Sequence, residues 1–387
     1  MPVLPMLATQ ARCLCYARTQ EGGAGGLFRP SEFRDLVSGR RRGLGAATLR
    51  LGLSLAEIPY TLAVRWRNRR YDTGREPIRR VPIPVVSVGN LTLGGTGKTP
   101  LVEWVARWFS HQGIRVGIVS RGYGAARGGP GVEARNDEAL ELERRLPGVP
   151  HVQNPDRVEG ARHAVDRFGC QALVLDDAFQ HRRLGRDLDL CLVDALEPFG
   201  YGHVFPRGTL REPPDGLRRA DVVVLSRADL VTAAARRSIR ATAARFAPGA
   251  AWAEVAHAPQ ALSNSRGECV ALASVAESPV AAFCGVGNPA GFRRTLENLS
   301  YRVIGFREFA DHYRYTRADV ESLIAWANRL DVAAVVCTSK DLVKLDIDRL
   351  GSRPLWAVSI VLNFLAGQEA VERKLIELVS RRTRDRR

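Results

Sequence analysis

The stretch VPIPVVSVGNLTLGGTGKTP, residues 81–100, decides the fold of this chain. A mostly apolar, β-branched run leads into a glycine-rich turn that ends in Gly97-Lys98-Thr99, and a pattern of helical period follows. Strand, glycine turn and helix in this order form a phosphate cradle, because backbone N–H groups converge on phosphate oxygens beside the positive end of the helix. In such a cradle Lys98 reaches the β- and γ-phosphates and the Thr99 hydroxyl holds Mg²⁺. We therefore expect the chain to bind a nucleoside triphosphate.

The turn departs from the G-x-x-x-x-G-K-[ST] pattern at its first position, where Thr92 replaces glycine. Gly94 and Gly95 can supply the backbone freedom that the missing glycine would have given. A glycine-rich turn also occurs without a phosphate, but the flanking strand and helix favour the cradle. The expected nucleotide-binding residues are Gly94, Gly95, Thr96, Gly97, Lys98 and Thr99.

Length and composition describe an ordinary globular protein. The 387 residues suffice for two domains, and 45% hydrophobic with 25% charged residues is a typical composition. Seven scattered cysteines without a C-x-x-C pair are typical of reduced thiols in a cytosolic protein. Short apolar runs alternate with helical patterns after the cradle, and a second such series begins near residue 266. The sequence therefore predicts an α/β fold: a P-loop NTPase-type, helix-covered parallel sheet with a second, smaller α/β domain.

The net charge of +16 suggests nucleic acid, an anionic membrane or a phosphorylated substrate as partner. Residues 40–80 alone hold eleven arginines against three acids, and they surround the apolar segment 44–66. Its uncharged runs are too short to span a bilayer. A segment with an apolar body, basic flanks and aromatic residues predicts a helix that lies at the interface of an anionic membrane. The alternative is a helix that packs on its own domain. Basic residues interleaved with aromatics are missing, so we do not expect nucleic acid as a partner.

These patterns divide the chain into five expected segments. They are a disordered extension (1–35), an amphipathic membrane-associating region (36–75), the P-loop domain (76–265), the smaller α/β domain (266–378) and a basic tail (379–387).

An apolar strand pattern at residues 173–177 ends in two carboxylates, Asp176 and Asp177. In a phosphate-cradle fold an acid at the tip of a neighbouring strand completes the Mg²⁺ site. The pair can also cap the next helix, although the cradle upstream favours the metal role. Gln180 follows closely and is expected to face the same pocket.

Other polar residues are ambiguous on their own. Asp137 and Glu138 begin a helical pattern, where acids are common as caps. A single histidine such as His312 is more often structural, although its FADHYRY turn is placed to face a cleft between the two domains. Segments 226–229 (SRAD) and 338–341 (TSKD) imitate the guanine-reading loop of GTPases, but neither fits the spacing well.

Eight motifs taken together are more specific than any one of them. They are GN with GGTGKTP (89–90, 94–100), SRGYG (120–124), DEAL (137–140), DDAFQHRRLGRDLDL (176–190), FGYGHVFPRGTLREP (199–213), FCGVGNPAGF (283–292), FADHYRY (309–315) and TSKDLVKL (338–345). On these motifs, over residues 44–375, the chain resembles the tetraacyldisaccharide 4′-kinases, the lipid A 4′-kinases of outer-membrane biogenesis. In that family the residue after the double aspartate is usually glycine, where this chain has Ala178.

The resemblance implies ATP-dependent phosphorylation of the 4′-hydroxyl of a tetraacylated glucosamine disaccharide 1-phosphate. It implies ATP and Mg²⁺ as cofactors, and an acylated lipid substrate as partner. It further implies a peripheral enzyme at the cytoplasmic face of the inner membrane, with a cleft between two hinged domains.

The resemblance also implies roles for residues at the matching positions. The cradle residues and Gln180 bind the nucleotide. Asp137 is implied as the catalytic base, paired with His312 from the second domain, and Arg157 as a contact to substrate or phosphate. The implied metal ligands are Thr99, Asp176, Asp177 and Glu212, and Asp177 also counts among the catalytic residues.

A nucleotide-driven switch or chaperone of the GTPase-like P-loop class is the alternative function. Such a protein would bind GTP tightly and ignore ATP. The poor fit of the two guanine-loop imitations argues against it.

Overall fold

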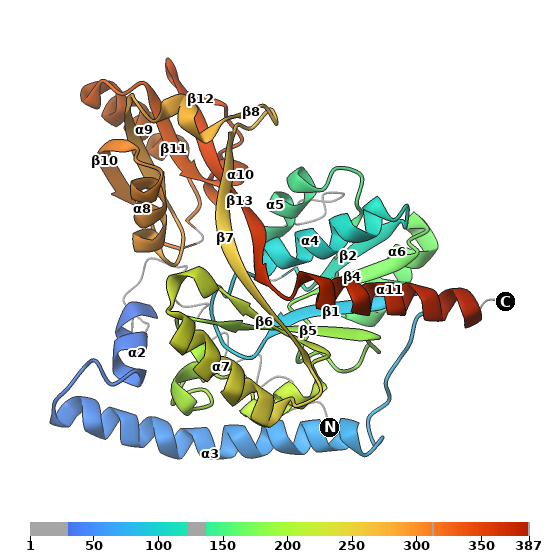
Figure 1. The fold of residues 1–387 in the computed structure, drawn as a ribbon. Coiled ribbons are helices and arrows are strands. Elements are labelled where there is room, and N and C mark those ends of the chain that lie inside the picture. The colour runs from blue at the N-terminus through green and yellow to red at the C-terminus, as the bar shows by residue number, and fades with distance from the viewer. Residues whose placement is uncertain (1–29, 123–136, 312, 386–387) are drawn as a thin grey trace.

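The structure is a computed structural model that describes residues 30–122, 137–311 and 313–385. Within these residues one mostly parallel sheet runs through the molecule, and helices lie on both of its faces (Figure 1). Along its main path the strand order is β10-β9-β11-β13-β7-β6-β5-β1-β4-β2-β3. The predicted fold class, a helix-covered α/β sheet of P-loop type with a second α/β unit, is confirmed.

Two groups of parallel strands are joined by a pair of long ones. The larger part contains β1 (Val85–Asn90), β2 (Val116–Ser120), β3 (His151–Gln153), β4 (Ala172–Asp176), β5 (Leu188–Asp194) and β6 (Val222–Ser226). The smaller part contains β9 (Pro279–Cys284), β10 (Arg302–Glu308) and β11 (Ala334–Thr338). The joining strands β7 (Ala251–Ser263) and β13 (Arg353–Ala366) are antiparallel, with short β8 (Cys269–Val270) and β12 (Arg349–Leu350) beside them.

Helices follow most strands. Before the sheet come α2 (Pro30–Val37) and α3 (Leu44–Asp72), and the larger part adds α4 (Lys98–His111), α5 (Asp137–Arg145), α6 (Arg157–Phe168) and α7 (Ala233–Phe246). The smaller part adds α8 (Pro289–Asn298), α9 (Arg317–Leu330) and α10 (Ser339–Leu345), and α11 (Gln368–Asp385) ends the described chain. Short 3₁₀ turns are η2 (Pro198–Gly202), η3 (Pro214–Arg219), η4 (Ala228–Leu230) and η5 (Leu272–Val275).

Strand β1 is buried along its whole length. Its Val86 and Val88 lie in a core with α4, whereas Val85 lies in a core with α6 on the other face. Successive side chains of a strand point to opposite faces, so a central strand covered by helices on both sides is apolar throughout. This explains the β-branched run that precedes the glycine turn.

Two segment boundaries differ from the sequence-based expectation. Helix α2 begins at Pro30, inside the extension expected to lack structure, while residues 1–29 lie outside the described ranges. Helix α11 runs through the expected basic tail to Asp385. Its Val371 and Leu375 are fully buried in the core of the larger part, so this helix packs away from the smaller domain to which it was assigned. The chain returns from the smaller part to the larger part along β13. The order of patterns in the sequence could not indicate this return.

Candidate active site

The glycine turn lies between the end of β1 and the start of α4. Gly94 and Gly97 have φ angles of 104° and 77°, in the left-handed region that favours glycine. A Cβ atom on Gly97 would lie 1.9 Å from Cε1 of His257 in β7, so no other residue fits there without rearrangement. The turn therefore delivers Lys98 and Thr99 to the N-terminus of α4, the expected place for a phosphate.

Asp177 lies between two cations. Lys98 Nζ is 3.5 Å from its Oδ1, and the guanidinium of Arg211 donates to the same oxygen at 2.6 Å. Arg211 also donates from Nε to the Thr92 carbonyl at 2.9 Å, so it ties the phosphate loop to the tip of β4. Sequence reasoning did not single out Arg211, although it precedes Glu212 in the LREP motif.

Asp176 is buried at the end of β4. Burial, and next the negative charge of Glu138, raise the pKa of its carboxyl to about 6, while Lys98 acts in the opposite direction. Within the described residues its Oδ1 has no hydrogen-bond partner. A buried carboxylate oxygen that lacks a partner is a suitable ligand for a cation.

The residues fit Mg²⁺ in the manner of phosphate-loop proteins. No preformed cage of three or more His, Cys, Asp or Glu side chains occurs in the described part of the chain. Mg²⁺ does not require one, because it usually keeps several waters and binds one or two carboxylates together with phosphate oxygens. Asp176, beside the P-loop lysine, supplies such a carboxylate.

Arg157, expected to contact substrate or phosphate, lies next to the end of β4. The expected contact stays a prediction. Arg157 is 3% exposed, and its Nη2 donates to the backbone oxygen of Asp176 at 2.9 Å. This contact holds the main chain at the end of β4, from which the Asp176 carboxylate projects.

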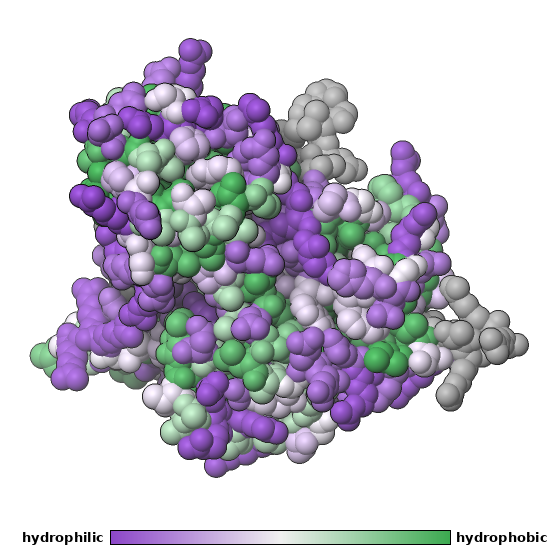
Figure 2. Space-filling model, turned by 45° about the horizontal axis from the view of Figure 1, so that its top comes forward, coloured by the Kyte–Doolittle hydropathy of each residue, from purple (hydrophilic) through white to green (hydrophobic). Residues whose placement is uncertain are grey.

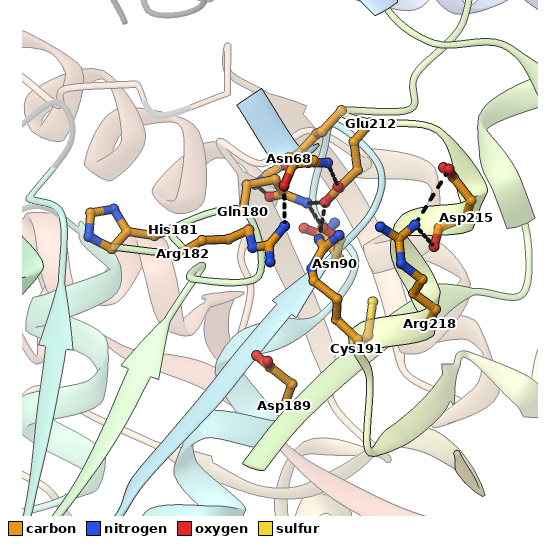
Figure 3. A network of polar contacts seen from close by, with 12 residues as sticks. Asn68, Asn90, Gln180, His181, Arg182, Asp189, Cys191, Glu212, Asp215 and Arg218 are labelled. Atoms are coloured by element: carbon orange, nitrogen blue, oxygen red, sulfur yellow. Dashed lines mark hydrogen bonds and ion pairs between the residues drawn. The ribbon is translucent and has the colours of Figure 1, made fainter. Parts of the chain in front are cut away.

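Glu212 is completely buried and both of its oxygens accept hydrogen bonds from the protein (Figure 3). Asn68 of α3 donates to Oε2 at 2.8 Å, while Gln180 and Arg219 donate to Oε1 at 3.1 and 2.7 Å. Burial alone would raise its pKa, but Arg219 and these hydrogen bonds outweigh burial and lower it. Glu212 thereby holds the side chains of Asn68, Gln180 and Arg219. These contacts support a positioning role for Glu212 better than the predicted role as metal ligand.

Gln180 is held by the same network. Its Nε2 donates to the Asn90 carbonyl at 2.9 Å, as well as to Glu212. Gln180 therefore lies where β1 runs into the phosphate loop. Its predicted contact with the nucleotide stays a prediction. Asn68 was missed, because nothing in the pattern of α3 indicates which residue faces the site.

Asp137 begins α5, and its carboxylate forms an ion pair with Lys344 of α10 at 3.1 Å. The adjacent Glu138 pairs with Lys340 at 3.0 Å. After burial, the negative charge of Glu138 is the next cause that raises the pKa of Asp176, so α5 begins within electrostatic range of the predicted metal site. His312, the predicted partner of Asp137, lies outside the described residues.

The two guanine-loop imitations have other roles. Arg227 in the first donates to the Gly95 carbonyl at 3.2 Å and pairs with Asp194. Asp341 in the second is fully buried. It accepts hydrogen bonds from the Gly285 N–H, the Tyr315 hydroxyl and the Thr338 hydroxyl. An aspartate engaged in this way is unavailable to a guanine base, so the GTPase-like alternative is not favoured.

Comparison with known proteins identifies the family of this chain. The family described as tetraacyldisaccharide-1-P 4′-kinase, LpxK, matches residues 49–380. The tetraacyldisaccharide 4′-kinase of Anaeromyxobacter dehalogenans strain 2CP-C is 44% identical, over 84% of this chain and 89% of the relative. That of Desulfatibacillum aliphaticivorans is 36% identical, over 84% and 91%.

A solved structure is also similar to this chain. It is the "apo" form of LpxK from Aquifex aeolicus in complex with ATP, with 30% identity and a TM-score of 0.69. The match covers 85% of this chain and 99% of the other. The resemblance inferred from the motifs is confirmed, and the chain belongs to the tetraacyldisaccharide-1-P 4′-kinase family.

Proposed function

We propose that this protein transfers the γ-phosphoryl group of ATP to the 4′-hydroxyl of a tetraacylated disaccharide 1-phosphate in lipid A biosynthesis. The observation that carries the proposal is family membership over residues 49–380, which includes the phosphate loop, Asp176 and the acids of α5. The ATP in the related Aquifex aeolicus structure supports ATP as the phosphoryl donor.

Nucleotide and metal would be held at the start of α4. Lys98 would contact the β- and γ-phosphates, and Mg²⁺ would be held by Thr99 and Asp176, with Asp177 beside them. Bound Mg²⁺ offsets negative charge on the phosphate oxygens. Lys98 and Arg211 supply further positive charge, and electrostatic stabilisation is most of what phosphoryl transfer requires. Glu212 would position Gln180, whose side chain donates a hydrogen bond to it.

Asp137 would be the general base, with His312 as its partner. A sugar hydroxyl has a pKa far above 7, so a carboxylate removes its proton only as attack on phosphorus proceeds. The position of Asp137 at the start of α5, near Asp176, supports this role.

Membrane association would come from α3. Seven large apolar residues are exposed along it: Leu44, Leu49, Leu51, Leu55, Ile58, Leu62 and Trp66. Hydrophilic residues are abundant on the face drawn in Figure 2, where apolar ones form smaller groups. None of the helices in the described ranges has the length and apolar character that a membrane span requires. We therefore propose peripheral binding of α3 to the anionic cytoplasmic face of the inner membrane.

A phosphoryl-transfer assay tests the proposal, with radiolabelled ATP and a tetraacyl disaccharide 1-phosphate in detergent. We expect 4′-phosphorylated product from the wild-type protein, and a loss of about 10²- to 10⁴-fold in kcat for Asp137→Asn. GTP in place of ATP is the specificity control. Tight GTP binding without phosphorylation of the lipid would instead favour the switch-like alternative.

A further inference from the structure

Helix α10 of the smaller part presents two lysines to the first turn of α5 in the larger part. Lys344 Nζ lies 3.1 Å from Oδ2 of Asp137, and Lys340 Nζ lies 3.0 Å from Oε1 of Glu138. The lysines are four residues apart in a helix and so share a face, while the two acids are adjacent in sequence. The paired contacts place α10 directly against the proposed base.

The two ion pairs are not equally exposed. The side chain of Lys344 is 8% exposed and that of Asp137 is 26% exposed, whereas the values for Lys340 and Glu138 are 30% and 41%. Exposed ion pairs contribute little, because water screens them and both side chains lose freedom. The Lys344 pair is therefore better suited than the Lys340 pair to fix the position of a carboxylate.

The lysines project from a firmly held helix. Asp341, between them, is fully buried and accepts hydrogen bonds from the Gly285 N–H at 3.0 Å and the Tyr315 hydroxyl at 2.9 Å. Thr338 caps the start of the helix and donates from its hydroxyl to the other oxygen of Asp341 at 2.6 Å. Lys344 is thus attached to a rigid element, which is what a positioning group needs.

The helix α5 is tied to the same element from its other end. Arg145 donates to the Ile360 carbonyl of β13 at 2.6 Å and to the Ser339 hydroxyl of α10 at 3.3 Å. It also donates to Glu103 of α4 at 2.9 Å. With α5 held at both ends, the distance between Lys344 and Asp137 is set by the packing of α5, α10 and β13.

We propose that Lys344 is a positioning residue that holds the carboxylate of Asp137 in the orientation needed to accept the proton of the acceptor hydroxyl. An aspartate at the first position of a helix has several rotamers, and some turn the carboxylate back to cap the helix. The ammonium of Lys344 selects one of them. The inference rests on the proposed function, since it requires Asp137 to be the base, and it makes α10 the element through which the smaller part completes the site.

The test compares Lys344→Met with Lys340→Met in the phosphoryl-transfer assay on the full-length protein. Methionine keeps most of the side-chain volume and removes the charge, and Asp137 is exposed enough to be solvated when its partner is lost. We expect kcat to fall about 10- to 100-fold for Lys344→Met, the scale of misplacing a reacting group, with the KM for ATP unchanged within about 2-fold. Lys340→Met should lose less than about 5-fold, and Lys344→Arg should recover part of the loss.

A double variant separates positioning from a general effect on the fold. If Lys344 acts through Asp137, Asp137→Asn/Lys344→Met has the same kcat as Asp137→Asn alone. If the kcat losses of the two single variants multiply in the double variant, the inference is overturned. Lys344 would then contact phosphate directly or have a structural role. An unchanged ATP-induced shift in Tm shows that the variants fold and bind nucleotide.

The same measurements distinguish this inference from the function on which it rests. A wild-type protein without transfer activity, or an Asp137→Asn variant with full kcat, would overturn the proposed function and this inference with it. A slow Asp137→Asn variant together with a Lys344→Met variant of wild-type kcat would overturn the inference alone.

Discussion

At Gly97 the phosphate loop has almost no room for a side chain. Its φ angle is 77°, and a Cβ atom there would overlap the His257 ring. We expect Gly97→Ala to destabilise the protein by about 1–3 kcal/mol and to abolish the ATP-induced rise in Tm, because the loop must move away from the phosphate position. Thermal denaturation with and without ATP and Mg²⁺ measures both effects.

Gly95→Ala is the matched control for that variant. A Cβ atom at Gly95 meets nothing within 4 Å, and its φ angle is not positive. The variant keeps the N–H group that a phosphate would use, so it should retain the ATP-induced shift. Equal losses in the two variants would contradict the steric explanation.

Asp176 gives a prediction about pH. Its folded pKa of about 6 lies above its ordinary value of 3.8, so the folded protein binds the proton more tightly than the unfolded chain. Above pH 6 the buried charge destabilises the fold, and this effect disappears as the pH falls from 6 towards 4. Asp176→Asn should therefore be more stable than wild type at pH 7.5, by at most about 3 kcal/mol, and equally stable near pH 4.

Urea denaturation in EDTA at the two pH values tests this. The same variant should lose kinase activity, since an amide is a poor ligand for Mg²⁺. A variant that is less stable than wild type at pH 7.5 would show that the carboxylate stabilises the fold.

The sequence alone predicted that Lys98, Thr99 and Asp176 belong to one site, because a phosphate loop and the tip of the neighbouring strand come together in any sheet of this class. It could not identify Arg211 or Lys344. Arg211 contacts Asp177 from a loop outside the strand pattern, and Lys344 meets Asp137 across 207 positions of sequence. Such contacts depend on which strands are neighbours, and the pattern of residues does not contain that information.

Among the elements, α3 packs on its own protein, which was one of the two alternatives that its sequence left open, while its predicted binding to a membrane stays a prediction. On its inner side Glu57 accepts a hydrogen bond from the Val204 N–H at 2.7 Å, and Tyr60 donates to the Arg211 carbonyl at 3.2 Å. On its outer side Leu51, Leu55 and Leu62 are 64%, 63% and 60% exposed. The helix packs on its own protein and still presents an apolar stripe to the surroundings.

The outer stripe predicts binding to vesicles. We expect Leu51→Ser/Leu55→Ser/Leu62→Ser to bind anionic phosphatidylglycerol vesicles about 10²-fold more weakly than wild type, at roughly 1 kcal/mol for each partly inserted leucine. Vesicle sedimentation measures this, and activity on detergent-solubilised acceptor should be kept. Removal of residues 1–66 is a less suitable variant, because it also deletes the contacts of Glu57 and Tyr60.

Exposed leucines elsewhere provide the control. Leu196, Leu230 and Leu365 are 46%, 42% and 42% exposed and lie outside α3. The triple serine variant at these positions should bind vesicles like wild type. If the two triple variants bind equally well, α3 is not the membrane-binding element.

In the whole molecule, β7 and β13 belong to both parts at once. They pair from Ser263 opposite Ala357 to Glu254 opposite Ala366. Leu262 of β7 lies in a core of the smaller part, whereas Val255 of the same strand lies in the core of the larger part. The sequence predicted two series of strands and helices correctly, but a strand shared by two cores does not differ in pattern from any other strand.

This sharing predicts how the protein unfolds. Chains with two α/β units often unfold in separate steps, but here neither unit can lose β7 and β13 without exposing the core of the other. The buried face of α11, which follows β13, adds to the larger core. We expect a single calorimetric transition that ATP with Mg²⁺ raises as a whole, by about 2.7 kcal/mol at a concentration of 100 Kd. Lys98→Met, which weakens ATP binding, should show the single transition without the ATP-induced shift. Two transitions in wild type, of which ATP moves only one, would mean that the shared strands do not couple the two parts.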